Sequence, residues 1–201
     1  VLVSLLVTLI CLLIAYPVAY ILSKMNKQVA FVLLLLFIMP MWINFVLRAM
    51  ALKELMSLVG IFGKYNFLNT VIGMVYDFLP YMILPIYSVM SKMDHRLIEA
   101  ASDLGCNGFG VLCKVILPLS ISGVISGVTM VFVPSISTFY ISQKLGGGSF
   151  DLIGDTIERQ FQNQITYNTG AAISLVMMIL ILISLAIMNK FSDAEDGGII
   201  V

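Results

Sequence analysis

The chain has 201 residues, of which 60% are hydrophobic and 11% are charged, and its formal net charge is zero. Its mean hydropathy is +1.05. A soluble domain of this length needs far more polar surface, so the composition indicates an all-α, multi-pass membrane protein. A net charge of zero produces no field that would attract nucleic acid, and we expect no nucleic-acid partner.

Five apolar stretches are long enough to cross a bilayer core, which takes about 20 helical residues. They cover residues 2–22, 29–50, 71–90, 115–136 and 170–188. A soluble bundle of buried helices is the alternative, but the near absence of charge inside the five stretches argues against it. The first stretch lacks the basic leader of a signal peptide. We therefore expect a membrane helix there, and we expect the natural protein to extend further toward its N-terminus.

The polar segment between the third and fourth stretches has the pattern of a short amphipathic helix. Asp94 can accept hydrogen bonds from the free N–H groups of a first helical turn. Leu97, Ala101 and Leu104 then recur at a spacing that puts them on one face. Gly105 follows, and glycine most easily adopts the left-handed conformation that ends a helix. The sequence predicts a helix that another surface can approach.

Two further segments break the apolar pattern. Residues 51–70 predict a short helix at the membrane interface. Within residues 143–169, Ile153, Ile157 and Phe161 recur every four residues and predict an amphipathic helix on the outer face. These segments separate the membrane stretches rather than dividing the chain into domains.

The residues that could support catalysis or bind a metal are few. His95 is the one histidine, and the acids are scattered, so we do not expect an enzyme. Cys11, Cys106 and Cys113 have no partner at metal-ligand spacing, and we expect neither a metal site nor a cofactor. Glycines 146–148 predict a turn and not a phosphate loop, because no Lys-Ser/Thr pair follows them.

The spacing E-A-A-x3-G-x9-[I/V]-x-L-P is spelled by Glu99-Ala100-Ala101, Gly105 and Val115-Ile116-Leu117-Pro118. It resembles the signature of the inner-membrane permease subunits of ATP-binding-cassette importers, in which isoleucine is most frequent at the position of Val115. A chance amphipathic loop is the alternative, but the required context between two membrane helices is present.

The resemblance implies the type I importer (MetI-like) fold, with five core transmembrane helices and a cytoplasmic coupling helix that docks on an ATPase subunit. The permease domain would cover residues 1–191, with the coupling loop at 91–114 and a disordered polar tail at 192–201. The residues implied in coupling are Asp94, Leu97, Ile98, Glu99, Ala100, Ala101, Leu104, Gly105, Leu117 and Pro118.

The resemblance also implies partners and a location. The partners are cytoplasmic ATPase subunits, a second homologous permease subunit in a heterodimer, an extracytoplasmic substrate-binding protein and the lipid bilayer. The location is the bacterial inner membrane. Since the loop would be cytoplasmic, Lys24 and Lys27 would also lie inside, in agreement with the positive-inside rule.

Other stretches are similar to the spermidine/putrescine permeases of this family. They are Pro40-Met41-Trp42-Ile43-Asn44 with Arg48, Leu79-Pro80-Tyr81-Met82, Leu84-Pro85-Ile86-Tyr87-Ser88, Phe139-Tyr140-Ile141-Ser142 and Leu152-Ile153-Gly154. The chain departs from that pattern at Val133-Pro134-Ser135 and Gln143-Lys144. Another small solute therefore stays open as the substrate: an inorganic anion, iron or an amino acid. An ion-driven carrier is the remaining alternative, and it would typically show inverted repeats or more buried ionisable groups.

A polyamine pathway needs carboxylates and aromatic faces, because an unpaired buried cation is very costly. The candidates are Trp42, Asn44, Tyr76, Asp77, Tyr81, Phe139, Tyr140, Asp155 and Glu158. Asp77 lies at membrane depth, where it either serves the substrate or makes a structural contact such as a pair with Arg48. Trp42 is alternatively an aromatic-belt anchor, and Asp155 and Glu158 are alternatively an ordinary solvated helix face.

Overall fold

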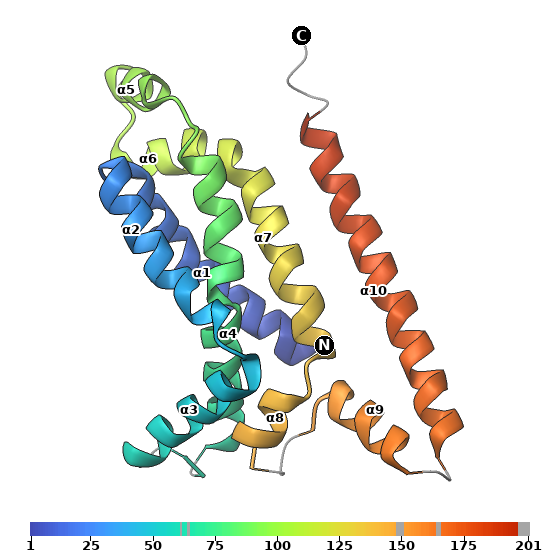
Figure 1. The fold of residues 1–201 in the computed structure, drawn as a ribbon. Helices are drawn as coiled ribbons and strands as arrows, with labels where there is room; N and C mark the ends of the chain where they lie inside the picture. The colour runs from blue at the N-terminus through green and yellow to red at the C-terminus, as the bar shows by residue number, and fades with distance from the viewer. Residues whose placement is uncertain (61, 64, 148–150, 164–165, 197–201) are drawn as a thin grey trace.

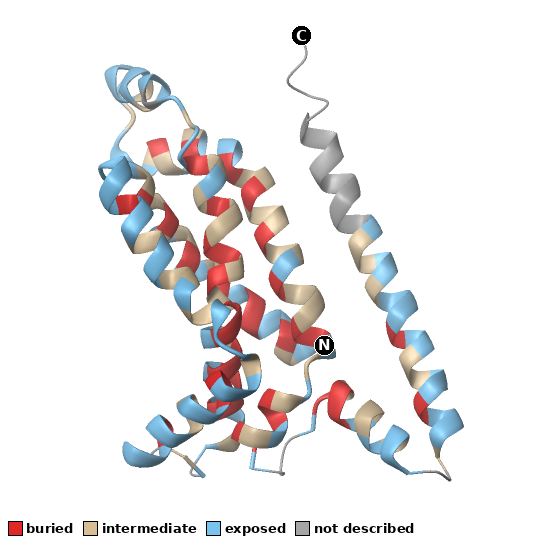
Figure 2. Ribbon diagram, viewed as in Figure 1, coloured by how far each residue is buried: buried red, intermediate tan, exposed pale blue. Residues whose placement is uncertain are grey.

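The computed structural model describes residues 1–60, 62–63, 65–147, 151–163 and 166–196, and within these ranges every regular element is a helix (Figure 1). Three helices form the centre of the bundle: α1 (Leu2–Lys24), α4 (Asn66–Met90) and α7 (Leu117–Ser137). Helix α4 has the most extensive contacts, with α1 and with α7. It also carries much of the buried core, as Figure 2 shows.

Two glycines allow α7 to lie close against α4. Gly123 and Gly127 are one helical turn apart on α7. A Cβ atom on Gly123 would lie 3.0 Å from the carbonyl oxygen of Pro85, and one on Gly127 would lie 2.8 Å from Sδ of Met82. Small residues at this spacing let membrane helices approach closely, so van der Waals packing can hold them together.

The second apolar stretch, predicted as a span over 29–50, is a bent pair of helices and not one continuous helix. The chain forms α2 (Lys27–Ile38), a 3-10 turn η1 (Met39–Trp42) and α3 (Phe45–Leu58), and it bends by 101° at the break. Pro40 has no N–H for a continuing helix. Asn44 then starts a new helix, because its Oδ1 accepts a hydrogen bond from the N–H of Val46 at 2.9 Å. The interfacial helix expected within 51–70 is the later part of α3.

The other predicted spans are confirmed. Helices α1 and α4, the helical run Gly108–Ser137 and α10 (Tyr167–Asp196) are long and apolar enough to cross a membrane, and the bent pair α2–α3 allows up to a fifth span. Helix α10 continues beyond its predicted end at 188, so residues 192–196 of the predicted disordered tail have a helical backbone. Residues 197–201 of that tail, and Gly148 of the predicted glycine turn, lie outside the described residues.

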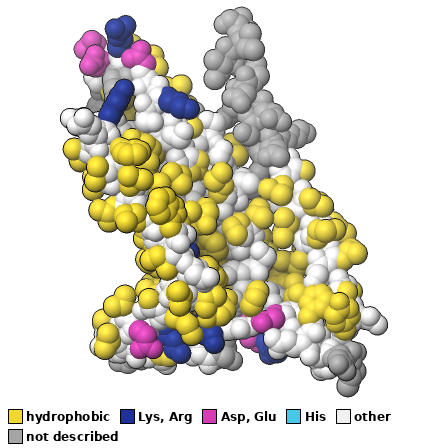
Figure 3. Space-filling model, in the orientation of Figure 1, with side chains coloured by type: hydrophobic (Ala, Val, Ile, Leu, Met, Phe, Trp, Pro, Cys, Tyr) yellow, Lys and Arg dark blue, Asp and Glu magenta, His cyan; other side chains and the backbone are white. Residues whose placement is uncertain are grey.

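The polar elements gather at the two ends of the bundle. Helix α5 (His95–Asp103) and α6 (Gly108–Val111) lie at one end, and α3, α8 (Tyr140–Leu145) and α9 (Ile153–Gln162) lie at the other. The space-filling view shows charged side chains at these ends and a band of hydrophobic side chains between them (Figure 3). Helix α9 occurs where the four-residue spacing predicted an amphipathic helix.

Candidate coupling helix and buried ion pair

Helix α5 begins and ends where the sequence predicts. Asp94 Oδ1 accepts a hydrogen bond from the N–H of Arg96 at 3.0 Å. At the other end Gly105 has φ +81°, and its N–H donates to the carbonyl of Ser102 at 2.9 Å. The next N–H, of Cys106, donates to the carbonyl of Ala101 at 3.1 Å. This pair of bonds is a Schellman motif. Local hydrogen bonds therefore cap helix α5 at both ends.

The apolar side chains of α5 divide between the bundle and the surface. Ile98 and Ala101 pack against the hydrophobic core. Leu97 is 48% exposed and Leu104 is 86% exposed, and Glu99 is also exposed. The predicted single apolar face thus has one part that anchors the helix and one part that is exposed. An exposed leucine pair on a projecting helix is available to a docking partner.

A π-helical segment connects α6 to α7. In η2 (Leu112–Ile116) the chain is wound more loosely, and the N–H of Leu117 donates to the carbonyl of Leu112, five residues back. Pro118 follows directly. In a regular α-helix a proline ring clashes with the carbonyl four residues earlier in the chain. Such segments often occur at functional sites. Leu117 and Pro118, both predicted in coupling, are exposed and start α7 rather than belonging to α5.

Asp77 and Arg48 form a buried ion pair between α4 and α3, and their side chains are 1% and 7% exposed. Arg48 Nη1 also donates to the carbonyl of Pro40 in η1 at 3.2 Å. The guanidinium carbon lies 5.9 Å from the ring centroid of Phe45 and 6.0 Å from that of Tyr76. The pairing with Arg48 that the sequence left open is present, and it ties the bent second span to α4.

The aromatic candidates lie in three different surroundings. Tyr140 lies with its ring centroid 6.0 Å from that of Phe45, so it adjoins the cluster around Arg48 and Tyr76. Phe45 was missed as a candidate, although its place three residues before Arg48 on one helix face could have suggested it. Tyr81 packs beside a neighbouring ring on its own helix. Trp42, which is 81% exposed, and Phe139, which is 38% exposed, lie on the surface.

Asn44 and Asp155 have capping roles that the sequence analysis did not assign. Asn44 caps α3, as described above. Asp155 is 2% exposed, so the alternative of an ordinary solvated helix face is wrong for it. Its Oδ2 accepts hydrogen bonds from Ser142 Oγ at 2.6 Å and from the N–H of Leu152 at 2.7 Å. The carboxylate joins α8 to the N-terminus of α9, where a negative charge is favoured.

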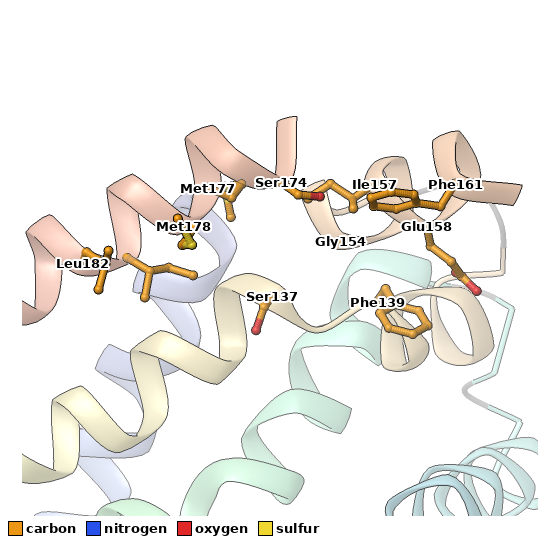
Figure 4. Close-up of a pocket in the computed structure, with 11 residues that line it drawn as sticks. Ser137, Phe139, Gly154, Ile157, Glu158, Phe161, Ser174, Met177, Met178 and Leu182 are labelled. Carbon is orange, nitrogen blue, oxygen red and sulfur yellow. The ribbon is translucent and has the colours of Figure 1, made fainter. Parts of the chain in front are cut away.

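Glu158 lies at the edge of an apolar cavity of about 520 Å³ between α9 and α10 (Figure 4). Phe139 and Phe161 line the same cavity. The Glu158 carboxylate accepts hydrogen bonds from the side-chain amides of Gln143 and Gln162, the latter at 3.1 Å. It is therefore engaged with neighbouring side chains at its own end of the bundle and does not join the cluster around Asp77.

Comparison with known proteins places this geometry in a family. Residues 6–195 match the model of the family described as "Binding-protein-dependent transport system inner membrane component". The chain belongs to this family. Membership, together with the apolar helices, makes it a multi-pass membrane protein, and it confirms the predicted fold class and the resemblance to importer permeases.

Several relatives are permeases named for spermidine/putrescine transport. The chain is 38% identical over 188 residues to PotB of Haemophilus influenzae, an alignment that covers 86% of this chain and 66% of the relative. It is 36% identical over 191 residues to PotB of Escherichia coli, with 88% and 70% covered. For PotB of Salmonella typhimurium the identity is 34% over 216 residues, with 96% and 75% covered. The chain thus spans 66% to 75% of the length of these permeases.

The capping role of Asp155 leads to a stability prediction for the permease. We expect Asp155→Ala to lower the free energy of unfolding by about 1–2 kcal/mol, because it removes the acceptor for the N–H of Leu152 at the start of α9 and the side-chain bond to Ser142. The measurement is thermal or denaturant unfolding of the purified chain in detergent. Uptake per folded molecule should stay at the wild-type level.

Asp151→Ala is the matched control, since it removes an acid at the same end of the molecule. Asp151 is 48% exposed and pairs with Arg159, which is 60% exposed. The hydrogen bond and charge of Asp151 raise the pKa of the Arg159 guanidinium. Exposed pairs contribute at most about 1 kcal/mol. Loss of uptake in Asp155→Ala with unchanged stability would contradict the capping role.

Proposed function

We propose that the chain is the transmembrane permease subunit of an ATP-binding-cassette importer for polyamines, with spermidine and putrescine as substrates. The observation that carries this proposal is the 34–38% identity, over most of the chain, to permeases of named spermidine/putrescine systems. We place the protein in the bacterial inner membrane. In this orientation α5 faces the cytoplasm, and α3, α8 and α9 face the outer side.

In this proposal α5 is the coupling helix. Its exposed Leu97 and Leu104 provide the apolar contact for an ATPase subunit, and its two caps keep it rigid. ATP binding closes the two ATPase subunits and moves α5. The helical run Gly108–Ser137 begins three residues after Gly105 and carries the movement into the bundle. The π-helical segment η2 in that run is suited to absorb a change of angle.

The pathway forms between this chain and a second, homologous permease subunit. Much of α10 exposes apolar side chains, such as Leu175 and Leu182, which are each 56% exposed and suit lipid or another helix. A soluble binding protein delivers the substrate at the outer end, and the two permeases alternate between outward and inward access. Nucleotide hydrolysis belongs to the ATPase subunits, and we assign no catalytic residue to this chain.

The buried cluster suits a cationic substrate. Asp77 is a carboxylate at membrane depth, the rings of Tyr76 and Phe45 lie beside its partner Arg48, and the ring of Tyr140 adjoins that of Phe45. Carboxylates and aromatic faces stabilise organic cations, because they offer negative charge and negative ring faces. An anion would instead need an excess of donors.

The test is a reconstituted complex of this chain with its ATPase, second permease and binding protein in proteoliposomes. Spermidine or putrescine should stimulate ATP hydrolysis and accumulate in an ATP-dependent manner, whereas sulfate, molybdate, iron chelates and amino acids should not. Asp77→Asn should lower polyamine uptake with little change in assembly. Stimulation only by an anion or a chelate would overturn the polyamine assignment, and uptake driven by an ion gradient without ATP would overturn the importer class.

A further inference from the structure

The groups around the Arg48 guanidinium form a binding site for an organic cation. They are the carboxylate of Asp77, the carbonyl of Pro40 and the rings of Phe45 and Tyr76. A carboxylate, a carbonyl and two ring faces are also the groups that would surround a primary ammonium, which donates three hydrogen bonds and is attracted to aromatic faces. The site is occupied by a side chain of the protein itself.

Arg48 does not use the full capacity of the carboxylate. A strong arginine–carboxylate pair has two parallel N–H···O bonds. Here Arg48 Nε contacts Oδ1 of Asp77, while Nη1 turns to the carbonyl of Pro40 at 3.2 Å. Oδ2 of Asp77 accepts no hydrogen bond from any residue that the structure describes. The carboxylate is buried with one oxygen available for a further donor.

We propose that Arg48 is a tethered occupant of an ammonium-binding site, and that an ammonium group of the substrate displaces it from Asp77. This inference rests on the proposed polyamine function. The exchange conserves charge, because one cation leaves Asp77 as another arrives. Asp77 is therefore never a bare buried anion, a state that would be strongly unfavourable. Arg48 also keeps small cations from occupying the site between transport cycles.

The position of the pair allows such an exchange. Asp77 lies 11 residues after the first residue of α4, which corresponds to about 16 Å from the outer end of the helix. The ring of Tyr76 lies beside the Arg48 guanidinium, and Tyr76 is 42% exposed. The guanidinium therefore lies one side chain below the surface of the chain. Arg48 is in the first turns of α3, at the bend, and its long side chain can carry the charge toward the outer end of the molecule.

Competition by Arg48 also explains how a buried carboxylate can belong to a transport pathway. A pathway site must bind its substrate weakly enough to release it. A returning guanidinium competes with the bound ammonium and favours release. This role differs from that of a purely structural ion pair, because it predicts that removing the arginine strengthens substrate binding.

The experiment is equilibrium binding of radiolabelled spermidine to the complete transporter in lipid nanodiscs, without the binding protein. Arg48→Met keeps an apolar stem of similar length and removes the cation. We expect it to tighten spermidine binding at least tenfold, whereas Arg48→Lys should stay within about threefold of wild type because a tethered cation remains. Adding Asp77→Asn to Arg48→Met should abolish the gain. Arg159→Met removes an exposed arginine at the outer end and should change nothing.

Two outcomes separate this inference from the proposed function. If the wild-type complex neither binds nor transports spermidine, the polyamine function fails. If the wild type transports spermidine and Arg48→Met binds it no more tightly, the tethered-occupant role is overturned while the function stands. Should Arg48→Met fail to accumulate, the charge-neutral variant Arg48→Met/Asp77→Asn decides: binding weaker than wild type supports an ammonium site at Asp77, and binding equal to wild type overturns it.

Discussion

Replacing the two exposed leucines of α5 with aspartate, as L97D/L104D, is expected to abolish ATP-driven uptake while the bundle stays folded. Leu97 and Leu104 are 48% and 86% exposed, so the fold loses little when they change. In the assembly proposed above they would be buried against the ATPase. Fully burying an exposed leucine contributes about 1.5–3 kcal/mol, and Leu97 is already about half buried, so the two leucines contribute about 2–4 kcal/mol, or roughly 30-fold to 1,000-fold in affinity. Copurification of the ATPase, spermidine-stimulated ATP hydrolysis and uptake should fall together.

Leu58→Asp is the matched control for this prediction. Leu58 is 83% exposed, close to the value for Leu104, but it ends α3 at the opposite end of the bundle from α5. The control should retain ATPase binding and coupling. Gly105→Trp tests the same helix through its cap, because any side chain at φ +81° strains the turn that ends α5. Full uptake by L97D/L104D would refute the coupling role of α5, as would equal losses in L97D/L104D and Leu58→Asp.

The features that were predicted correctly depend on short stretches of sequence. The ends of α5 depend on Asp94 and Gly105, and each acts on backbone groups within a few residues. The spans α1, α4, α7 and α10 follow from hydropathy alone, because a bilayer requires every backbone group to be satisfied within a helix. Local chemistry of this kind does not depend on which elements pack together.

The features that were missed depend on contacts between distant segments. A proline such as Pro40 can interrupt a helix, but the 101° bend depends on α3 lying across the end of the bundle and on Arg48 reaching Asp77. The sequence pattern placed Asp155 and Glu158 on one helix, but it could not show that α8 packs over Asp155. Hydropathy ended the last span at 188, although a helical backbone can continue to Asp196 through polar residues.

A valine at Gly127 is expected to destabilise the bundle although valine is more hydrophobic than glycine. The added Cβ would lie 2.8 Å from Sδ of Met82, 3.2 Å from the Met82 carbonyl oxygen and 3.3 Å from Cγ of Pro85. The methionine side chain can move, but the carbonyl and the proline ring belong to the rigid part of α4. Overpacking of this kind costs about 1–3 kcal/mol, so the free energy of unfolding in mixed micelles should fall by about 2 kcal/mol.

Gly108→Val provides the comparison, since Gly108 has open space around its Cβ position. It should change the unfolding free energy by less than about 0.5 kcal/mol. Lipid tails are as apolar as valine, so hydrophobicity gives α7 no preference for α4 over lipid, and close contact at Gly123 and Gly127 must supply the attraction. Greater stability in Gly127→Val would mean that apolar surface, and not close fit, joins these helices. A loss that is shared by Gly127→Val and Gly123→Val but absent in Gly108→Val would locate the attraction at the α4–α7 contact.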